Sequence, residues 1–282
     1  MRFPIGIITS SFRTDLRASL HKAAQLGADG VQIYAVRGEV SPEMSASARA
    51  ELRDAVASEG LVISALCGDM GTGGFCFPEN NAYKVEYSKR IVDLAKDLGT
   101  DIITTHIGVV PADPSHPRFG VMQQACGELA EYAGSVGAHF AVETGPEPAK
   151  VLKAFLDTLP GTGVAVNLDP ANLKMVCDDD PVEAVRTLKD YIVHTHAKDG
   201  KMLYFKNPEF IYGLQQETIV TDPSFAEVPL GQGNVDFPRY LKALEEIGFK
   251  GFLTIEREVG DDPAADIASA VEFLKKTMAE NV

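Results

Sequence analysis

Four short stretches of this sequence share one pattern: HFAVETG at residues 139–145, VAVNLDP at 164–170, IVHTHAKD at 192–199 and LTIERE at 253–258. Each is an apolar run, rich in β-branched residues, that leads into a carboxylate or an imidazole, as a buried strand does where it reaches a polar edge. Asp169 follows Glu143 by 26 residues and His196 follows Asp169 by 27, which leaves room for one strand–helix unit each time. These stretches therefore predict neighbouring parallel strands joined by crossover helices.

The same alternation of strand and helix runs through the rest of the chain. The segments at 91–98 and 267–278 each place their apolar residues on a single helical face. Several helical segments end in glycine just before the next apolar run, as a helix C-cap predicts; these glycines are Gly27, Gly60, Gly99 and Gly248. The strands are expected at Phe3–Thr9, Gly30–Tyr34, Val62–Cys67, Asp101–Ile107, His139–Glu143, Val164–Asp169, Tyr191–His196 and Phe252–Glu256.

Eight strand–helix units predict an α/β fold of the (β/α)8 type, a TIM barrel that uses residues 1–282 as a single domain. A doubly wound open sheet is the rival fold. That fold favours a glycine-rich phosphate loop after its first strand, whereas residues 9–12 here read TSSF. We therefore expect the closed barrel.

Residues 200–235 form a long insertion after the seventh expected strand. An insertion at the C-terminal end of a barrel strand lies on the catalytic face, so we interpret this one as a lid or as a contact between subunits. A plain solvated loop is the alternative, and the number of aromatic residues disfavours it. These residues are Tyr204, Phe205, Phe210, Tyr212 and Phe225.

Charge and composition exclude several classes of partner. The formal net charge is −14 and the sequence pI is about 4.9, so the surface repels nucleic acid and anionic membranes. No apolar run approaches the roughly 20 residues of a membrane helix, and the N-terminal run is too short for a signal peptide. The four cysteines have no CxxC spacing, which indicates reduced thiols. We therefore expect a cytoplasmic protein.

The polar residues at the four strand ends suit a metal ion. Glu143, Asp169, His196 and Glu256 follow apolar runs on consecutive strands, so they can meet at the mouth of a barrel. Three carboxylates buried together would repel one another strongly, and a divalent cation removes that cost. Carboxylates and one imidazole favour Mn²⁺, with Mg²⁺, Co²⁺ and Zn²⁺ as alternatives.

Each of these residues taken alone has a simpler interpretation. A glutamate at a strand end is usually a solvated charge or an ion-pair partner, and a lone histidine on a strand is usually a core residue. Four such residues at matching positions on successive strands favour the metal site over four unrelated structural roles.

The chain resembles the xylose isomerase-like barrel superfamily, in particular its ketose 3-epimerases, inosose dehydratases and sugar phosphate isomerases/epimerases. The resemblance covers nearly the whole chain. Its marks are ETG at 143–145, NLDPANL at 167–173, the HxHxKD pattern at 194–199 and PLGQGNVDFPRYLKALEEIGFKGFLTIERE at 229–258. It implies that Glu143, Asp169, His196 and Glu256 bind one divalent metal, that Glu143 and Glu256 form the catalytic acid/base pair, and that the protein is a homodimer or homotetramer.

Six further residues are candidates for binding substrate: His106, Glu147, Asn172, His194, Lys198 and Glu258. His194 shares the inward face of its strand with His196 and is the alternative metal ligand. In the epimerases that this chain resembles, a substrate-binding histidine stands where this chain has Asn172. An amide can hydrogen-bond a hydroxyl but does not change protonation state near neutral pH, so the substrate is the more open question.

The function that this resemblance implies is that of a metal-dependent sugar isomerase or epimerase. The carboxylate pair would move a proton next to a carbonyl through a metal-stabilised enediolate of a sugar or polyol. A dehydratase or lyase that eliminates a β-leaving group from a keto-inositol or a 3-keto sugar needs the same residues and remains the alternative. A nuclease is disfavoured by the acidic charge, and a non-catalytic scaffold by the intact ligand set. No cluster of cations marks a phosphate site, which favours an unphosphorylated substrate.

Overall fold

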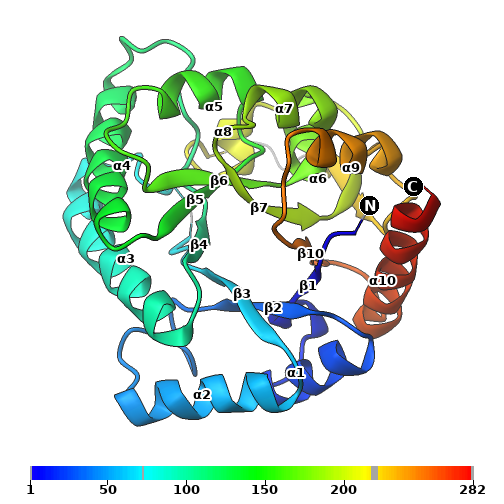
Figure 1. Ribbon diagram of the computed structural model, residues 1–282. Helices are drawn as coiled ribbons and strands as arrows, with labels where there is room; N and C mark the ends of the chain where they lie inside the picture. The colour runs from blue at the N-terminus through cyan, green and yellow to red at the C-terminus, as the bar shows by residue number, and fades with distance from the viewer. Residues whose placement is uncertain (1, 72, 217–221, 281–282) are drawn as a thin grey trace.

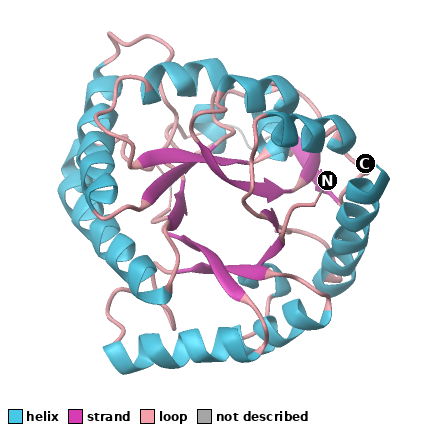
Figure 2. Ribbon diagram, viewed as in Figure 1, coloured by secondary structure: helices cyan, strands magenta, loops and turns pink. Residues whose placement is uncertain are grey.

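The computed structural model describes residues 2–71, 73–216 and 222–280. Its eight parallel strands close into a barrel in the order β1-β10-β7-β6-β5-β4-β3-β2, and the helices surround it (Figures 1 and 2). The predicted TIM barrel is confirmed. The barrel strands are β1 (Ile5–Ile8), β2 (Gly30–Tyr34), β3 (Val62–Cys67), β4 (Ile102–Thr105), β5 (His139–Glu143), β6 (Val164–Leu168), β7 (Ile192–Ala197) and β10 (Leu253–Ile255).

Four of the helices end just before the glycines that the sequence marks as helix ends. The four glycines expected as C-caps all have positive φ angles, between 74° and 84°, which side chains other than glycine rarely adopt. None of the described helices combines the length and the apolar character that crossing a bilayer requires. The helices are α1 (Leu16–Gln25), α2 (Ala46–Ser58), α3 (Pro78–Leu98), α4 (Pro117–Ser135), α5 (Ala149–Leu156), α6 (Pro170–Asn172), α7 (Pro181–Thr187), α8 (Pro208–Ile211), α9 (Phe237–Glu246) and α10 (Pro263–Glu280).

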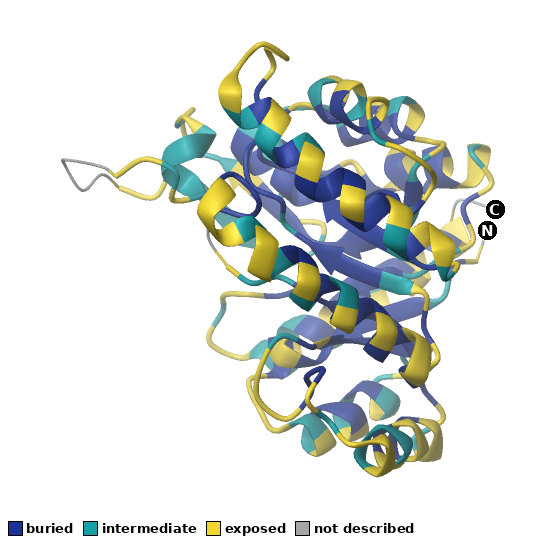
Figure 3. Ribbon diagram, turned by 90° about the vertical axis from the view of Figure 1, so that its left-hand side faces the viewer, coloured by how far each residue is buried: buried dark blue, intermediate teal, exposed yellow. Residues whose placement is uncertain are grey.

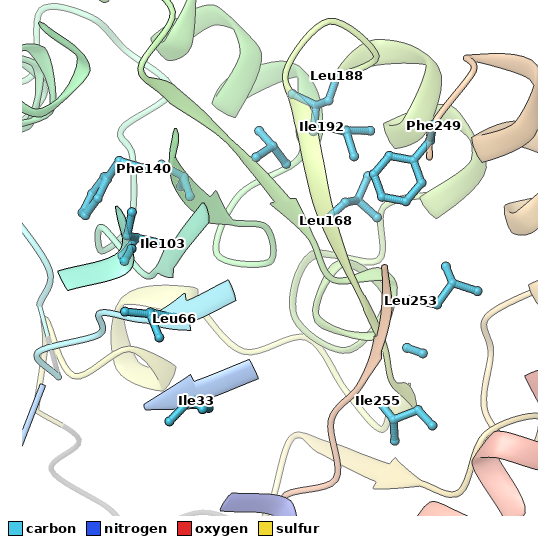
Figure 4. Packing of buried hydrophobic residues seen from close by; sticks show 14 of the residues in the cluster. Ile33, Leu66, Ile103, Phe140, Leu168, Leu188, Ile192, Phe249, Leu253 and Ile255 are labelled. Atoms are coloured by element: carbon cyan, nitrogen blue, oxygen red, sulfur yellow. The ribbon is translucent and has the colours of Figure 1, made fainter. Parts of the chain in front are cut away.

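The hydrophobic core lies between the barrel and its helices. The helices bury one face and expose the other, while the strands are buried almost throughout (Figure 3). Alternate strand residues point outward into this layer, among them Ile33, Ile103, Phe140, Leu253 and Ile255 (Figure 4). Burial of this layer is the main source of the stability that holds the strand ends in place.

The interior of the barrel is polar near its C-terminal end. Gln32 of β2 bonds Thr104 of β4 and His196 of β7, and neither of those strands is a neighbour of β2, so both bonds cross the barrel. Asn167 and His194 form a second set of bonds beside them. Side chains alternate along a strand, so the same strands face apolar helices outside and a hydrogen-bonded interior within.

The insertion after β7 folds into a hairpin. It pairs β8 (Asp199–Met202) with β9 (Phe225–Val228) in antiparallel register, and α8 lies between them in sequence. The carboxylate of Asp199 accepts four backbone N–H groups, from Gly200, Gly231, Gly233 and Val235, and so ties the two ends of the insertion together. Residues 217–221 of the expected insertion lie outside the described residues.

Candidate metal centre

The structure brings together the four side chains expected to hold a metal. Glu143 is the last residue of β5, Asp169 and Glu256 directly follow β6 and β10, and His196 lies in β7. One ligand atom from each of the four lies within 4.8 Å of the others. His196 Nδ1 lies 3.3 Å from an Asp169 oxygen, 3.4 Å from a Glu256 oxygen and 3.6 Å from a Glu143 oxygen.

The donor set fits a divalent cation. All four residues are at most 8% exposed, so three carboxylates share one poorly hydrated volume. Such a group is costly to bury without a positive charge at its centre. Three carboxylate oxygens and one imidazole nitrogen around a common point are ligands for Mn²⁺, Mg²⁺, Co²⁺ or Zn²⁺.

The pKa values of His196 and Glu256 reflect how the carboxylates and the cations of this cluster act on one another. Burial alone would lower the pKa of His196, but the carboxylates of Glu143 and Glu256 outweigh it and hold that pKa well above its usual range. Burial would likewise raise the pKa of Glu256, yet Lys198 and His196 hold it well below its usual range. Glu256 is thus kept ionised, which is the form of a carboxyl that binds a metal.

The ETG motif supports the next strand as well as supplying Glu143 to the cluster. The hydroxyl of Thr144 accepts a hydrogen bond from the Asp169 N–H at 2.8 Å and donates one to the Asp169 carbonyl at 3.0 Å. Gly145 has φ +141°, and a Cβ there would lie 2.5 Å from the Cβ of Asn172. The motif therefore fixes the backbone of one ligand and makes room for the residue that bonds another.

Asn172 contacts Glu143 directly. Its side-chain N–H donates to Glu143 Oε1 at 2.9 Å, and Asn167 donates to Glu143 Oε2 at 3.3 Å. Each oxygen of this carboxylate is thus held by an amide. Asn172 also lines the cavity at the barrel mouth, so it is placed to meet a substrate as well.

A cavity of about 230 Å³ lies at the C-terminal ends of the strands, and Glu143, His196 and Glu256 of the cluster line it. Substrates of TIM-barrel enzymes bind at this end of the barrel. Of the expected substrate contacts, four line it: His106, Asn172, Lys198 and Glu258. Within the described chain, the lining includes neither His194 nor Glu147.

His194 is held away from the cluster by bonds on both of its ring nitrogens. Its Nδ1 lies 2.9 Å from Asn167 Oδ1 and its Nε2 lies 2.9 Å from the Thr254 hydroxyl. Burial and the neighbouring His196 hold the pKa of His194 well below its usual range. The imidazole that faces the carboxylates is therefore that of His196.

Glu147 is buried beneath the loops. Its Oε2 accepts the backbone N–H of Val110, and its Oε1 has no partner among the described residues. Burial raises the pKa of this carboxyl to about 8. Its place in the structure is that of a tie between the loops that follow β4 and β5.

Lys198 is the cation of the cavity wall. Its ammonium group lies 2.9 Å from Glu256 Oε2, contacts Glu258, and lies 3.8 Å from Glu227 of the hairpin. Arg257 in turn binds Glu227 and Asp266. This ion-pair network joins the ends of β7 and β10 to the insertion.

Several cavity residues escaped the sequence analysis. Asp69, after β3, lies 3.0 Å from His106 Nδ1, while His106 Nε2 lies 3.6 Å from Glu143. Burial works against it, but the carboxylates of Glu143 and Asp69 raise the pKa of His106 to about 9. Asp69 follows an apolar run, as the other strand-end acids do, so the same pattern could have found it. Tyr212, one of the aromatic residues expected in the insertion, has its ring 5.7 Å from that of His106, a contact that no strand-end pattern predicts.

Comparison with known proteins identifies relatives of this chain. A family model described as "Xylose isomerase-like TIM barrel" matches residues 20–277. The L-ribulose-5-phosphate 3-epimerase UlaE of Escherichia coli O157:H7 is 25% identical over 248 residues, which are 84% of this chain and 80% of that protein.

Solved structures of xylose isomerase-like proteins have the same fold. A xylose isomerase domain protein from Planctomyces limnophilus is 28% identical, with a TM-score of 0.81 over 99% of this chain and 97% of that one. A xylose isomerase-like TIM barrel protein from Mycobacterium smegmatis, solved in complex with magnesium, is 19% identical, with a TM-score of 0.73 over 99% and 97% of the two chains.

Proposed function

The chain belongs to the xylose isomerase-like TIM barrel family, and from that premise we propose that it is a divalent-metal-dependent sugar isomerase or epimerase. The observation that carries the proposal is the convergence of Glu143, Asp169, His196 and Glu256, whose ligand atoms lie within 4.8 Å of one another under an open cavity. We propose these four as the metal ligands, and Mn²⁺ or Mg²⁺ as the ion.

Glu143 and Glu256 are proposed as the acid/base pair. A bound divalent ion would polarise the substrate carbonyl and stabilise the enediolate charge left by proton removal. One of the two glutamates accepts the proton from the carbon next to the carbonyl, and the other returns a proton. Both line the cavity, and each is already held by donors, Glu143 by two amides and Glu256 by Lys198, so neither needs to reorient before reaction.

The remaining polar residues of the wall would orient the sugar. His106 and Asn172 present N–H groups beside Glu143, and Lys198 and Glu258 lie on the side of Glu256. Tyr212 covers the His106 side from the insertion. A small polyhydroxylated molecule suits a cavity of this size and polarity, since such sites use a few placed polar groups.

The charges around the mouth favour an unphosphorylated substrate. Barrels commonly bind phosphate at the loops after their last two strands, and here those loops and the hairpin carry Glu227 and Glu258. The nearby cations are already engaged: Lys198 and Arg257 by carboxylates, and Arg13 by the carbonyls of Glu258 and Gly260. In this respect we propose a different substrate from that named for the E. coli epimerase.

The test is proton exchange on candidate ketoses in D2O. Purified protein with Mn²⁺ should introduce deuterium next to the carbonyl of at least one free ketose, and removal of metal with EDTA should abolish the exchange. Glu143→Gln and Glu256→Gln should each lower turnover by at least about 100-fold, the contribution of a general acid or base. Wild-type turnover in both variants would refute the assignment. Loss of water from the product, seen by mass, would instead identify a dehydratase.

A further inference from the structure

The two ring nitrogens of His196 have different surroundings. Its Nδ1 points at the three carboxylates, at 3.3 to 3.6 Å. Its Nε2 points into the barrel interior, where the side-chain oxygen of Gln32 lies 3.2 Å away. If a metal ion takes the lone pair of Nδ1, the single hydrogen of the neutral ring must sit on Nε2, where it needs an acceptor.

The side-chain oxygen of Gln32 is positioned to accept this hydrogen bond. It is 1% exposed, and its Nε2 donates at 2.8 Å to the hydroxyl of Thr104, which is 0% exposed. This bond holds the NH2 end of the amide on the β4 side of the barrel and leaves the oxygen facing His196. The contact spans the barrel from β2 to β7, so the fold brings the two residues together from 164 positions apart.

A second amide lies near Nε2 but cannot accept from it. The Nδ2 of Asn167 lies 3.1 Å from His196 Nε2, and an amide nitrogen has only hydrogens to offer. Its oxygen faces His194 Nδ1, and its nitrogen donates to Glu143. Within the described part of the chain, Gln32 is therefore the acceptor available to Nε2.

We propose that Gln32 is a positioning residue of the metal centre, which keeps the His196 hydrogen on Nε2 and so directs the lone pair of Nδ1 at the ion. The inference rests on the proposed metal site and is independent of which sugar the enzyme uses. Removal of such a partner of a ligating histidine typically weakens metal binding by about 10–100-fold.

Calorimetric titration of the metal-free protein with Mn²⁺ tests the proposal. Gln32→Leu, which removes the acceptor, should weaken binding by about 10–100-fold. Gln32→Glu keeps an acceptor oxygen and should bind Mn²⁺ at least as tightly as wild type. Ser64→Ala is the control, because it removes another buried side-chain bond of the barrel, to Val31 of the adjacent strand, without touching the cluster. Equal affinity of wild type and the leucine variant would overturn the proposal.

The ring itself can be read directly, which keeps the test valid if the leucine variant does not fold. In wild-type protein loaded with Zn²⁺, ¹⁵N NMR should show a hydrogen on Nε2 of His196 and a metal-shifted Nδ1. A hydrogen on Nδ1 instead would overturn the inference. Wild type that binds no divalent ion would count against the proposed function, whereas tight binding that is indifferent to Gln32 would count only against this inference.

Discussion

The ammonium group of Lys198 lies 2.9 Å from the Glu256 oxygen that also faces His196 Nδ1. Lys198 therefore supplies a positive charge to a cluster that otherwise consists mostly of buried carboxylates. Lys198→Met should destabilise the metal-free protein by about 3–5 kcal/mol, because the carboxylates lose their partner. Added Mn²⁺ should restore more stability to this variant than to wild type, as thermal unfolding with and without EDTA can measure. Lys201→Met, on the exposed side of the hairpin, is the control. It should change neither the stability of the metal-free protein nor the stability gained on adding Mn²⁺.

Thr144 should contribute to stability through two bonds to one neighbour. Thr144→Val keeps the shape of the side chain but leaves the buried N–H of Asp169 without an acceptor, which typically costs about 1–3 kcal/mol. Thr144→Ser keeps the hydroxyl and should stay close to wild type. Urea unfolding of the two variants measures the difference, and equal loss in both would show that the hydroxyl is not responsible.

Glu147 should make stability fall as pH rises. The unfolded carboxyl ionises near pH ~4.3, whereas burial raises the folded pKa to about 8. Between these values the folded chain retains a proton that the unfolded chain has lost, so this group costs increasing stability up to about pH 8. Glu147→Gln should remove that component and be more stable than wild type at pH 8, by up to about 5 kcal/mol at about 1.4 kcal/mol per pKa unit.

Urea midpoints measured from pH 5 to 8 would show this difference. Glu131→Gln, on the exposed face of α4, is the matched control and should leave the pH profile of wild type unchanged. A glutamine variant at 147 with the same slope as wild type would contradict the assignment.

The ion pair between Arg118 of α4 and Glu209 of α8 should hold the insertion over the cavity. Glu209→Gln should loosen residues 207–215 by about 1 kcal/mol and speed their amide exchange by about fivefold, with little effect on global stability. Hydrogen–deuterium exchange read by mass spectrometry measures this. Glu183→Gln, which breaks an exposed pair on α7, should leave those peptides unchanged.

The strand ends were more difficult to predict than the strands. The sequence places Asp169 and Glu256 inside strands, but the observed strands end one residue earlier, at Leu168 and Ile255. Likewise Phe3–Thr9 is observed as Ile5–Ile8 and Asp101–Ile107 as Ile102–Thr105, each shorter at both ends. The convergence of the ligands was still predictable, because it depends on strand order and not on exact bounds.

What the sequence could not show is contact across the barrel. Gln32 lies in the run GVQIY, which resembles any buried strand, and its importance depends on His196 on the far wall. Tyr212 depends likewise on how the insertion folds back. The homodimer or homotetramer stays a prediction; size-exclusion chromatography with light scattering would test it. The exposed side chains of Tyr204 and Phe205 offer a surface for such contacts.

The carboxylate of Asp199 accepts N–H groups from both ends of the long insertion. Its two attachment points are consequently a fixed distance apart, whatever length of chain runs between them. Changes within the insertion need therefore not move the barrel strands that position Glu143, Asp169, His196 and Glu256. Segments between β8 and β9 could be exchanged among relatives to alter which molecules enter the cavity, while these four residues stay in place.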